Sequence, residues 1–122
     1  MYDTGVLIAA ERSERRIWAE HRVRLEAGMV PLVPAPVIAQ ASRSSRQAQM
    51  RRLLRGCDVV PFGEADAHAA GALLGRTRTK DVVYASVAVV AIRHEADVVS
   101  ADADDIRRLL SAARATLTIL DV

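Results

Sequence analysis

Short apolar runs alternate with longer helical stretches along the whole chain, and this alternation constrains the fold more than any other feature. Four runs are typical of buried strands: VPLV at 30–33, CDVV at 57–60, DVVS at 97–100 and TLTIL at 116–120. Seven stretches are typical of helices: residues 5–10, 14–27, 37–43, 46–54, 64–74, 79–94 and 104–113. Such alternation predicts βαβ units and a parallel sheet. The length of 122 residues is that of one domain, so we expect a single α/β domain over residues 1–122.

Individual residues predict where some of these helices begin and end. Thr4 is placed to cap the first helix, because a hydroxyl can accept a hydrogen bond from a free amide of the first turn. Gly28 and Gly75 are expected to follow the ends of the second and fifth helices. The helix at 79–94 is apolar on nearly every side, which predicts a helix buried against the sheet.

Composition limits the compartment and the partners. The net charge is only +2, but sixteen arginines accompany a single lysine, Lys80, and arginine can bind phosphate or carboxylate in a bidentate manner. This composition is compatible with RNA or with an acidic protein partner. Cys57 is the one cysteine, so no disulfide framework or zinc-binding cluster is expected. With no signal peptide and no apolar run long enough to cross a membrane, we expect a cytoplasmic protein.

Three aspartates lie where short strands end or a helix begins. Asp3 follows the first apolar residues, Asp102 comes two residues after the strand at 97–100, and Asp81 opens the buried helix. In open α/β sheets, ligands bind beyond the carboxyl ends of the strands. Hard cations such as Mg²⁺ prefer oxygen ligands, and carboxylates can hold them against a phosphodiester.

Each aspartate also has a purely structural interpretation. Asp81 lies in the first turn of a helix, where the helix dipole favours a negative charge. One of Asp102, Asp104 and Asp105 is expected to cap the helix that follows. Asp3 is the hardest to explain structurally, because a carboxylate among apolar residues is costly to bury unless it is paired, hydrogen-bonded or bound to metal.

Four segments together resemble one known family. DTGVLIA at 3–9, PVIAQASR at 36–43, KDVVYASVAVVA at 80–91 and VVSADADDIRRL at 98–109 follow one another in the order found in PIN domains. They are most similar to the VapC-type toxins of bacterial toxin–antitoxin pairs. The resemblance implies a three-layer α/β/α sandwich with a mostly parallel central sheet. It also implies a homodimeric endoribonuclease that uses Mg²⁺ or Mn²⁺ and is inhibited by a cognate antitoxin entering the active-site groove.

The resemblance assigns roles to individual residues. Asp3 matches the first acid and would be a metal ligand, while Ser100 and Asp102 match the Thr/Ser-x-Asp motif that supplies the fourth acid. The second acid is usually glutamate, and here it is Gln40, whose amide can orient water but adds no charge. The third acid lies eighteen residues before Asp102, and that position is Tyr84. The predicted catalytic set is therefore Asp3, Gln40, Asp81, Ser100 and Asp102, of which Asp3, Asp81 and Asp102 would bind the metal.

These departures leave more than one function open. The chain could be a metal-dependent endoribonuclease in which Asp81, one helical turn before Tyr84, takes the place of the third acid. It could instead be a non-catalytic PIN module that binds an antitoxin or RNA. A receiver-like phosphotransfer domain is a third hypothesis, but no glycine-rich phosphate loop supports it. The first strand is also shorter than the resemblance implies, which indicates either a start upstream of Met1 or a truncated central strand.

A cluster of positive charge between residues 42 and 55 is a further candidate for binding. This segment, SRSSRQAQMRRLLR, contains five arginines that could contact RNA phosphates or an acidic antitoxin tail. A solvent-exposed helix face would explain the same arginines without a partner.

Overall fold

The computed structural model describes all residues from 1 to 122 and contains seven helices and four short strands. The helices are α1 (Thr4–Glu11), α2 (Arg15–Glu26), α3 (Ala35–Ala41), α4 (Ala48–Leu54), α5 (Glu64–Thr77), α6 (Val82–His94) and α7 (Ala103–Ala112). The strands are β1 (Leu32–Pro34), β2 (Asp58–Val60), β3 (Val98–Ser100) and β4 (Ile119–Asp121). Every expected strand and helix is present, with ends shifted by a few residues.

The strands form two parallel pairs with the first residues of the chain between them. β1 pairs with β2 and β3 pairs with β4, both in parallel. The amide of Tyr2 donates to the carbonyl of Leu32 in β1 at 2.9 Å, and the amide of Asp3 donates to the carbonyl of Val99 in β3 at 3.3 Å. The order is therefore β2, β1, residues 1–3, β3 and β4. This arrangement confirms the predicted parallel sheet and places Asp3 at its centre.

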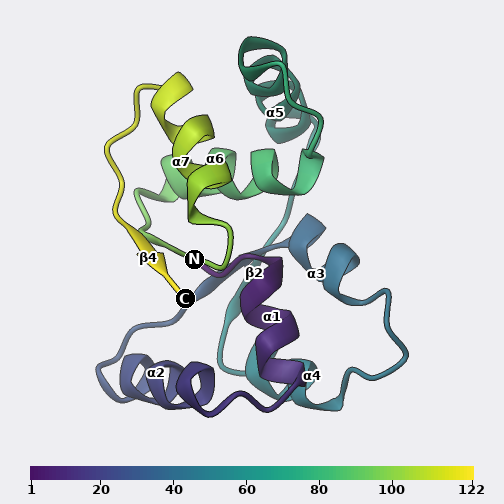
Figure 1. Ribbon diagram of the computed structural model, residues 1–122, viewed down its shortest axis with the longest axis vertical. Coiled ribbons are helices and arrows are strands. Elements are labelled where there is room, and N and C mark those ends of the chain that lie inside the picture. The colour runs from purple at the N-terminus through teal and green to yellow at the C-terminus, as the bar shows by residue number, and fades with distance from the viewer.

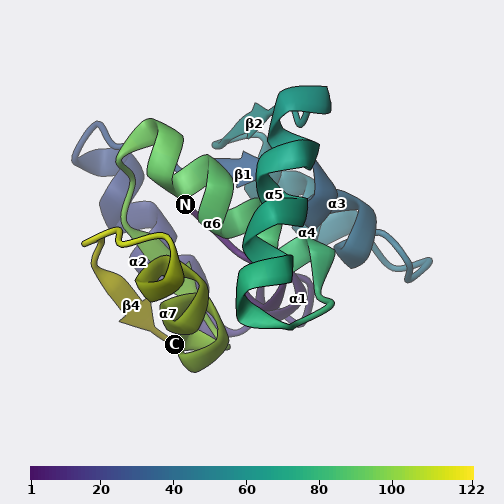
Figure 2. The ribbon, with the colours of Figure 1, turned by 90° about the horizontal axis from the view of Figure 1, so that it is seen from above.

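Helices cover both faces of these strands, as the resemblance implied. Figure 1 shows α5, α6 and α7 together on one side and α1, α2 and α4 on the other, with the strands between. Seen from above in Figure 2, α5 lies over α1 and α4. α6 packs against both α5 and α7, and its central residues, from Ala85 to Ala88, are fully buried. The prediction that this helix is buried is thus confirmed. Twenty-two buried side chains drawn from both sides form one continuous core.

Two of the expected helix ends were wrong. α1 is capped by Asp3, whose carboxylate accepts from the amide of Val6, and not by Thr4. α5 continues past Gly75 to Thr77, and the residue after it, Arg78, adopts the left-handed conformation with φ of 56°. Gly75 lies in open space within the helix, so nothing forces the chain to turn there. By contrast, Gly28 follows the end of α2 with φ of 77°, as predicted.

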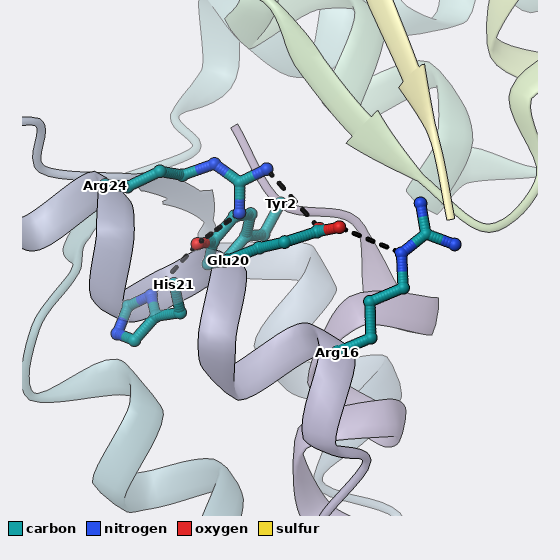
Figure 3. A network of polar contacts seen from close by, with 5 residues as sticks. All are labelled: Tyr2, Arg16, Glu20, His21 and Arg24. Carbon is teal, nitrogen blue, oxygen red and sulfur yellow. Dashed lines mark hydrogen bonds and ion pairs between the residues drawn. The ribbon is translucent and has the colours of Figure 1, made fainter.

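A polar network fastens α2 to the centre of the sheet (Figure 3). The hydroxyl of buried Tyr2 lies 2.9 Å from Nδ1 of His21 and accepts a hydrogen bond from Arg24 at 3.2 Å. Glu20 lies 3.8 Å from Arg24 and accepts a hydrogen bond from Arg16 at 2.9 Å. The residue directly before Asp3 is therefore held by α2 as well as by the strands on each side.

The seven helices are all unsuited to crossing a bilayer, because none combines the required length with a sufficiently apolar sequence.

Candidate functional site

Asp3 lies at the carboxyl end of the central segment and at the start of α1, almost completely buried, with 1% of its surface exposed. Its Oδ1 accepts from the amide of Val6 at 3.2 Å. Its Oδ2 accepts from the hydroxyl of Ser100 at 2.5 Å and from the amide of Ala101 at 3.2 Å. Three donors therefore converge on this carboxyl group, one from α1 and two from the end of β3.

Burial dominates the electrostatics of Asp3. Removal from water raises the pKa of this carboxyl group, since burial disfavours the charged form. The hydrogen bonds from Ser100, Val6 and Ala101 act in the opposite direction, and the nearby charge of Asp102 raises the pKa further. The carboxyl group thus lies in a site that supplies donors but no cationic side chain.

Ser100 links Asp3 to Asp102. Its hydroxyl donates to Asp3 and accepts from the amide of Asp102 at 2.9 Å. Ser100 is fully buried at the end of β3, while Asp102 is exposed at the start of α7. Asp102 stands at the capping position, but its side chain makes no capping hydrogen bond, so its carboxylate is available to other groups. The structure therefore brings Asp3, Ser100 and Asp102 together.

Tyr84 provides the partner of Asp102. The phenol of Tyr84, in the first turn of α6, donates to Oδ2 of Asp102 at 2.5 Å. Burial, followed by the hydrogen bond to Asp102 and the charge of Asp102, strongly raises the pKa of this phenol. Tyr84 is therefore a neutral hydrogen-bond donor at neutral pH and a poor ligand for a cation.

Asp81 caps α6 and lies at the solvent-exposed edge of this group. Its Oδ1 accepts from the amide of Tyr84 at 2.9 Å. No hydrogen bond joins Asp81 to Asp3, Ser100 or Asp102. In the structure its local contact is the capping of a helix that otherwise has no acid in its first turn.

Gln40 belongs to α3 and is not part of the hydrogen-bonded group formed by Asp3, Ser100 and Asp102. It is exposed near the end of α3 and lines a hollow together with Arg12 and Arg43. Its amide makes no hydrogen bond with any of the other predicted site residues. The structure thus joins three of the five predicted residues directly and leaves Asp81 and Gln40 at the margins.

The side chains as placed do not fit a divalent cation. No three acidic, histidine or cysteine side chains lie together in the arrangement of a metal centre. Mg²⁺ binds through carboxylates and usually keeps several waters, so a site needs free carboxylate oxygens. Here Oδ2 of Asp3 already accepts two hydrogen bonds, and Oδ2 of Asp102 accepts the phenol of Tyr84. The carboxylate of Asp102 thus has a neutral hydrogen-bond donor, Tyr84, as its partner where a metal site would have a cation.

Gly5 is a further residue of this site, and sequence reasoning missed it. A Cβ at position 5 would lie 2.5 Å from the Cβ of Ala101 and 3.5 Å from Oδ1 of Asp3. The first turn of α1 therefore approaches the loop after β3 more closely than any side chain permits. The only hint in the sequence was the glycine of Asp3-Thr4-Gly5 itself.

Comparisons with known proteins identify the fold and the family of the chain. No curated protein matches the sequence. Among solved structures, one chain of VapBC2 from Rickettsia felis, crystallised with a DNA fragment from its promoter, is similar to all of this chain. The match covers 97% of that chain with a TM-score of 0.75, at 15% sequence identity. The model of the PIN domain matches residues 1–110, and the chain therefore belongs to the PIN domain family.

Proposed function

We propose that the protein is the PIN-domain member of a toxin–antitoxin pair, which binds RNA and a cognate antitoxin in the cytoplasm but cleaves RNA slowly. The observation that carries the proposal of slow cleavage is the hydrogen bond from Tyr84 to Asp102. PIN domains are typically nucleases that use divalent metals, so the state of these acids decides the activity. The similarity to a chain of VapBC2 supports the proposed membership of a toxin–antitoxin pair.

The slow reaction follows from the charge of the site. Two of the four positions at which the family resemblance predicts acids hold neutral side chains, Gln40 and Tyr84. A cation that binds to Asp3 and Asp102 would have to displace the phenol of Tyr84 and compete with the donors on Asp3. Both changes weaken the binding of the metal on which the family's reaction depends.

A second candidate is an ordinary metal-dependent endoribonuclease toxin. In that case Asp3, Asp81 and Asp102 would hold Mg²⁺ or Mn²⁺, and Gln40 and Ser100 would orient the carboxylates and water. The observation that favours it is the link through Ser100, whose hydroxyl donates to the carboxylate of Asp3 and accepts from the backbone amide of Asp102. This candidate requires the side chains of Tyr84 and Asp81 to move from their present contacts.

Cleavage of structured RNA in the presence of Mn²⁺ separates the two candidates. We expect little cleavage by the wild type and at least tenfold faster cleavage by Tyr84→Asp, because the substitution removes the phenol and adds a carboxylate. EDTA should abolish that gain, and so should Asp3→Asn in the same background. Tyr84→Phe is the matched control, since it removes the hydroxyl without adding a charge.

The outcome that contradicts slow cleavage is a wild type that already cleaves rapidly and gains nothing from Tyr84→Asp. The proposed homodimer and the antitoxin complex need separate measurements. The mass of the pure protein in solution reports the dimer, and coexpression with the product of the neighbouring gene reports the antitoxin.

A further inference from the structure

A hollow beside α1 lies outside the aspartate site, since none of Asp3, Ser100 and Asp102 lines it. It has a volume of about 670 Å³ and lies between the second half of α1, the end of α3 with the turn that follows, and the start of α4. Its floor is formed by Leu7, Ala41 and Met50, which are all buried. Ile8, with 39% of its surface exposed, is the one apolar side chain of the rim that stays open to water.

The rim of the hollow is positively charged. Arg12 comes from the end of α1, and Arg43 and Arg46 come from the turn after α3. All three are exposed, and none forms an ion pair. The only acid of the lining is Glu11, which accepts a hydrogen bond from the amide of Met50 at 3.3 Å. Three arginines against one glutamate leave a formal charge of 3 − 1 = +2 around the hollow.

The structure divides the five arginines between residues 42 and 55 into different roles. Arg51 donates to Gln47, and the guanidinium of Arg52 stacks 4.2 Å above the ring of Trp18. These two therefore have partners within the protein. Arg55 is exposed directly after α4 and does not line the hollow. Arg43 and Arg46 face the hollow without a partner, where they meet Arg12 from a different element.

The hollow lies along α1 from the aspartate site. Asp3 caps the start of this helix, and Arg12 follows its last residue. Nine positions correspond to about 13 Å along a helix axis at a rise of about 1.5 Å per residue. Gln40, which occupies the second-acid position of the family resemblance, also lines this hollow. A chain of phosphates that leaves Asp3 and Asp102 along α1 would therefore pass these arginines.

We infer that Arg12, Arg43 and Arg46 bind phosphates of single-stranded RNA on its way to the aspartate site. Guanidinium groups bind phosphate oxygens in a bidentate manner, and neutralised phosphates release counterions, which supplies the affinity. The rim favours RNA, since three exposed arginines without ion-pair partners surround the hollow and Glu11 is the only acid that lines it. This inference rests on the proposed binding of RNA and adds the residues that perform it.

The test is binding of a fluorescently labelled single-stranded RNA, followed by anisotropy in EDTA so that no cleavage occurs. The triple variant Arg12→Gln, Arg43→Gln and Arg46→Gln should bind at least tenfold more weakly than the wild type. The slope of the logarithm of its binding constant against the logarithm of the salt concentration should be smaller in magnitude by about 2, because each phosphate contact on a single strand contributes about 0.7 to this slope. Circular dichroism establishes that the variant remains folded.

A matched control carries the same loss of charge elsewhere. Arg16→Gln, Arg22→Gln and Arg114→Gln together also remove three positive charges from exposed positions. We expect this control to bind RNA nearly as tightly as the wild type. Equal losses in the two triple variants would show that only net charge matters and would overturn the inference.

Two further outcomes are also decisive. If the triple variant of the hollow binds RNA as well as the wild type but no longer holds the antitoxin, the surface is a protein site and the inference is wrong. Because binding is measured without metal, rapid cleavage by the wild type would contradict only the slow reaction proposed above. Loss of binding in the triple variant would stand in either case.

Discussion

Asp3 is a buried carboxyl group whose surroundings consist of hydrogen-bond donors. Burying an ionised group costs several kcal/mol or more, and hydrogen bonds recover part of that cost (~1.5–3 kcal/mol each when one partner is charged). The donors come from Ser100 and from the amides of Val6 and Ala101. Two of them lie nearly a hundred positions away in the sequence, so the local geometry of Asp3 depends on the packing of α1 against the loop after β3.

Gly5 allows this packing, and its substitution gives the prediction at the scale of one residue. We expect Gly5→Ala to destabilise the protein by about 1–3 kcal/mol, the usual cost of overpacking, because the new Cβ would meet the Cβ of Ala101 at 2.5 Å. Urea unfolding measures the change. Gly71→Ala is the control, since Gly71 lies in open space within α5 and alanine there should stabilise the helix by about 0.5–1 kcal/mol. Equal stability of wild type and Gly5→Ala would show that the loop moves away freely.

The sequence predicted Asp3, Asp81 and Asp102 as neighbours because each lies where a strand ends or a helix starts, and parallel strands end at the same edge; Ser100 was added only by the family resemblance. It could not predict what those groups bind. The bond between Tyr84 and Asp102 depends on how α6 is rotated against α7, and this rotation is set by the packing of the whole core. The same reason explains why Gly5 was missed.

At the scale of elements, α2 is joined to the central segment through His21. Burial, and then the positive charge of Arg24, lower the pKa of this histidine. Its Nδ1 can accept a hydrogen bond from the Tyr2 hydroxyl only while that nitrogen is unprotonated. Trp18 packs its ring edge-on against His21, and Arg52 and Glu26 line the hollow beside it. The positive charge of Arg24 therefore disfavours protonation of His21.

His21 gives the prediction for pH. A histidine with a lowered pKa in the folded state stabilises the fold above its unfolded pKa of about 6.5, and this contribution is lost as the pH falls below that value. As the pH falls through that value, the free energy of unfolding should therefore decrease more in the wild type than in His21→Asn, whose side chain does not titrate. His68→Asn, on the exposed surface of α5, should behave like the wild type. A variant lacking His21 with an unchanged pH dependence would contradict the role of this network.

The elements themselves were largely predictable, since the apolar periods of strands and helices are local properties of the sequence. Their ends were less so. Gly75 failed as the end of α5 because a glycine permits a turn but does not impose one, and Arg78 takes the left-handed position three residues later. Thr4 failed as a cap because Asp3, one position earlier, offers a stronger acceptor to the same first turn.

At the scale of the whole molecule, residues 1–3 join the two strand pairs, and one core runs through both layers of helices. We therefore expect residues 1–122 to unfold as one cooperative unit. Fluorescence of Trp18, which reports on α2, and far-ultraviolet circular dichroism, which reports on all helices, should give coincident transitions in urea. Transitions that differ in midpoint would show that the half containing α1–α4 unfolds separately from the half containing α5–α7.

The central position of residues 1–3 has a consequence for the synthesis of the protein. Asp3 leaves the ribosome long before its hydroxyl donor Ser100, which lies 97 positions later. At about 5–20 residues per second, several seconds separate the two events. During that interval the carboxylate has neither β3 beside it nor the hydroxyl that holds it. Whatever chemistry the aspartates perform is thus absent from the growing chain until β3 and the residues that follow it, up to Asp102, have been made.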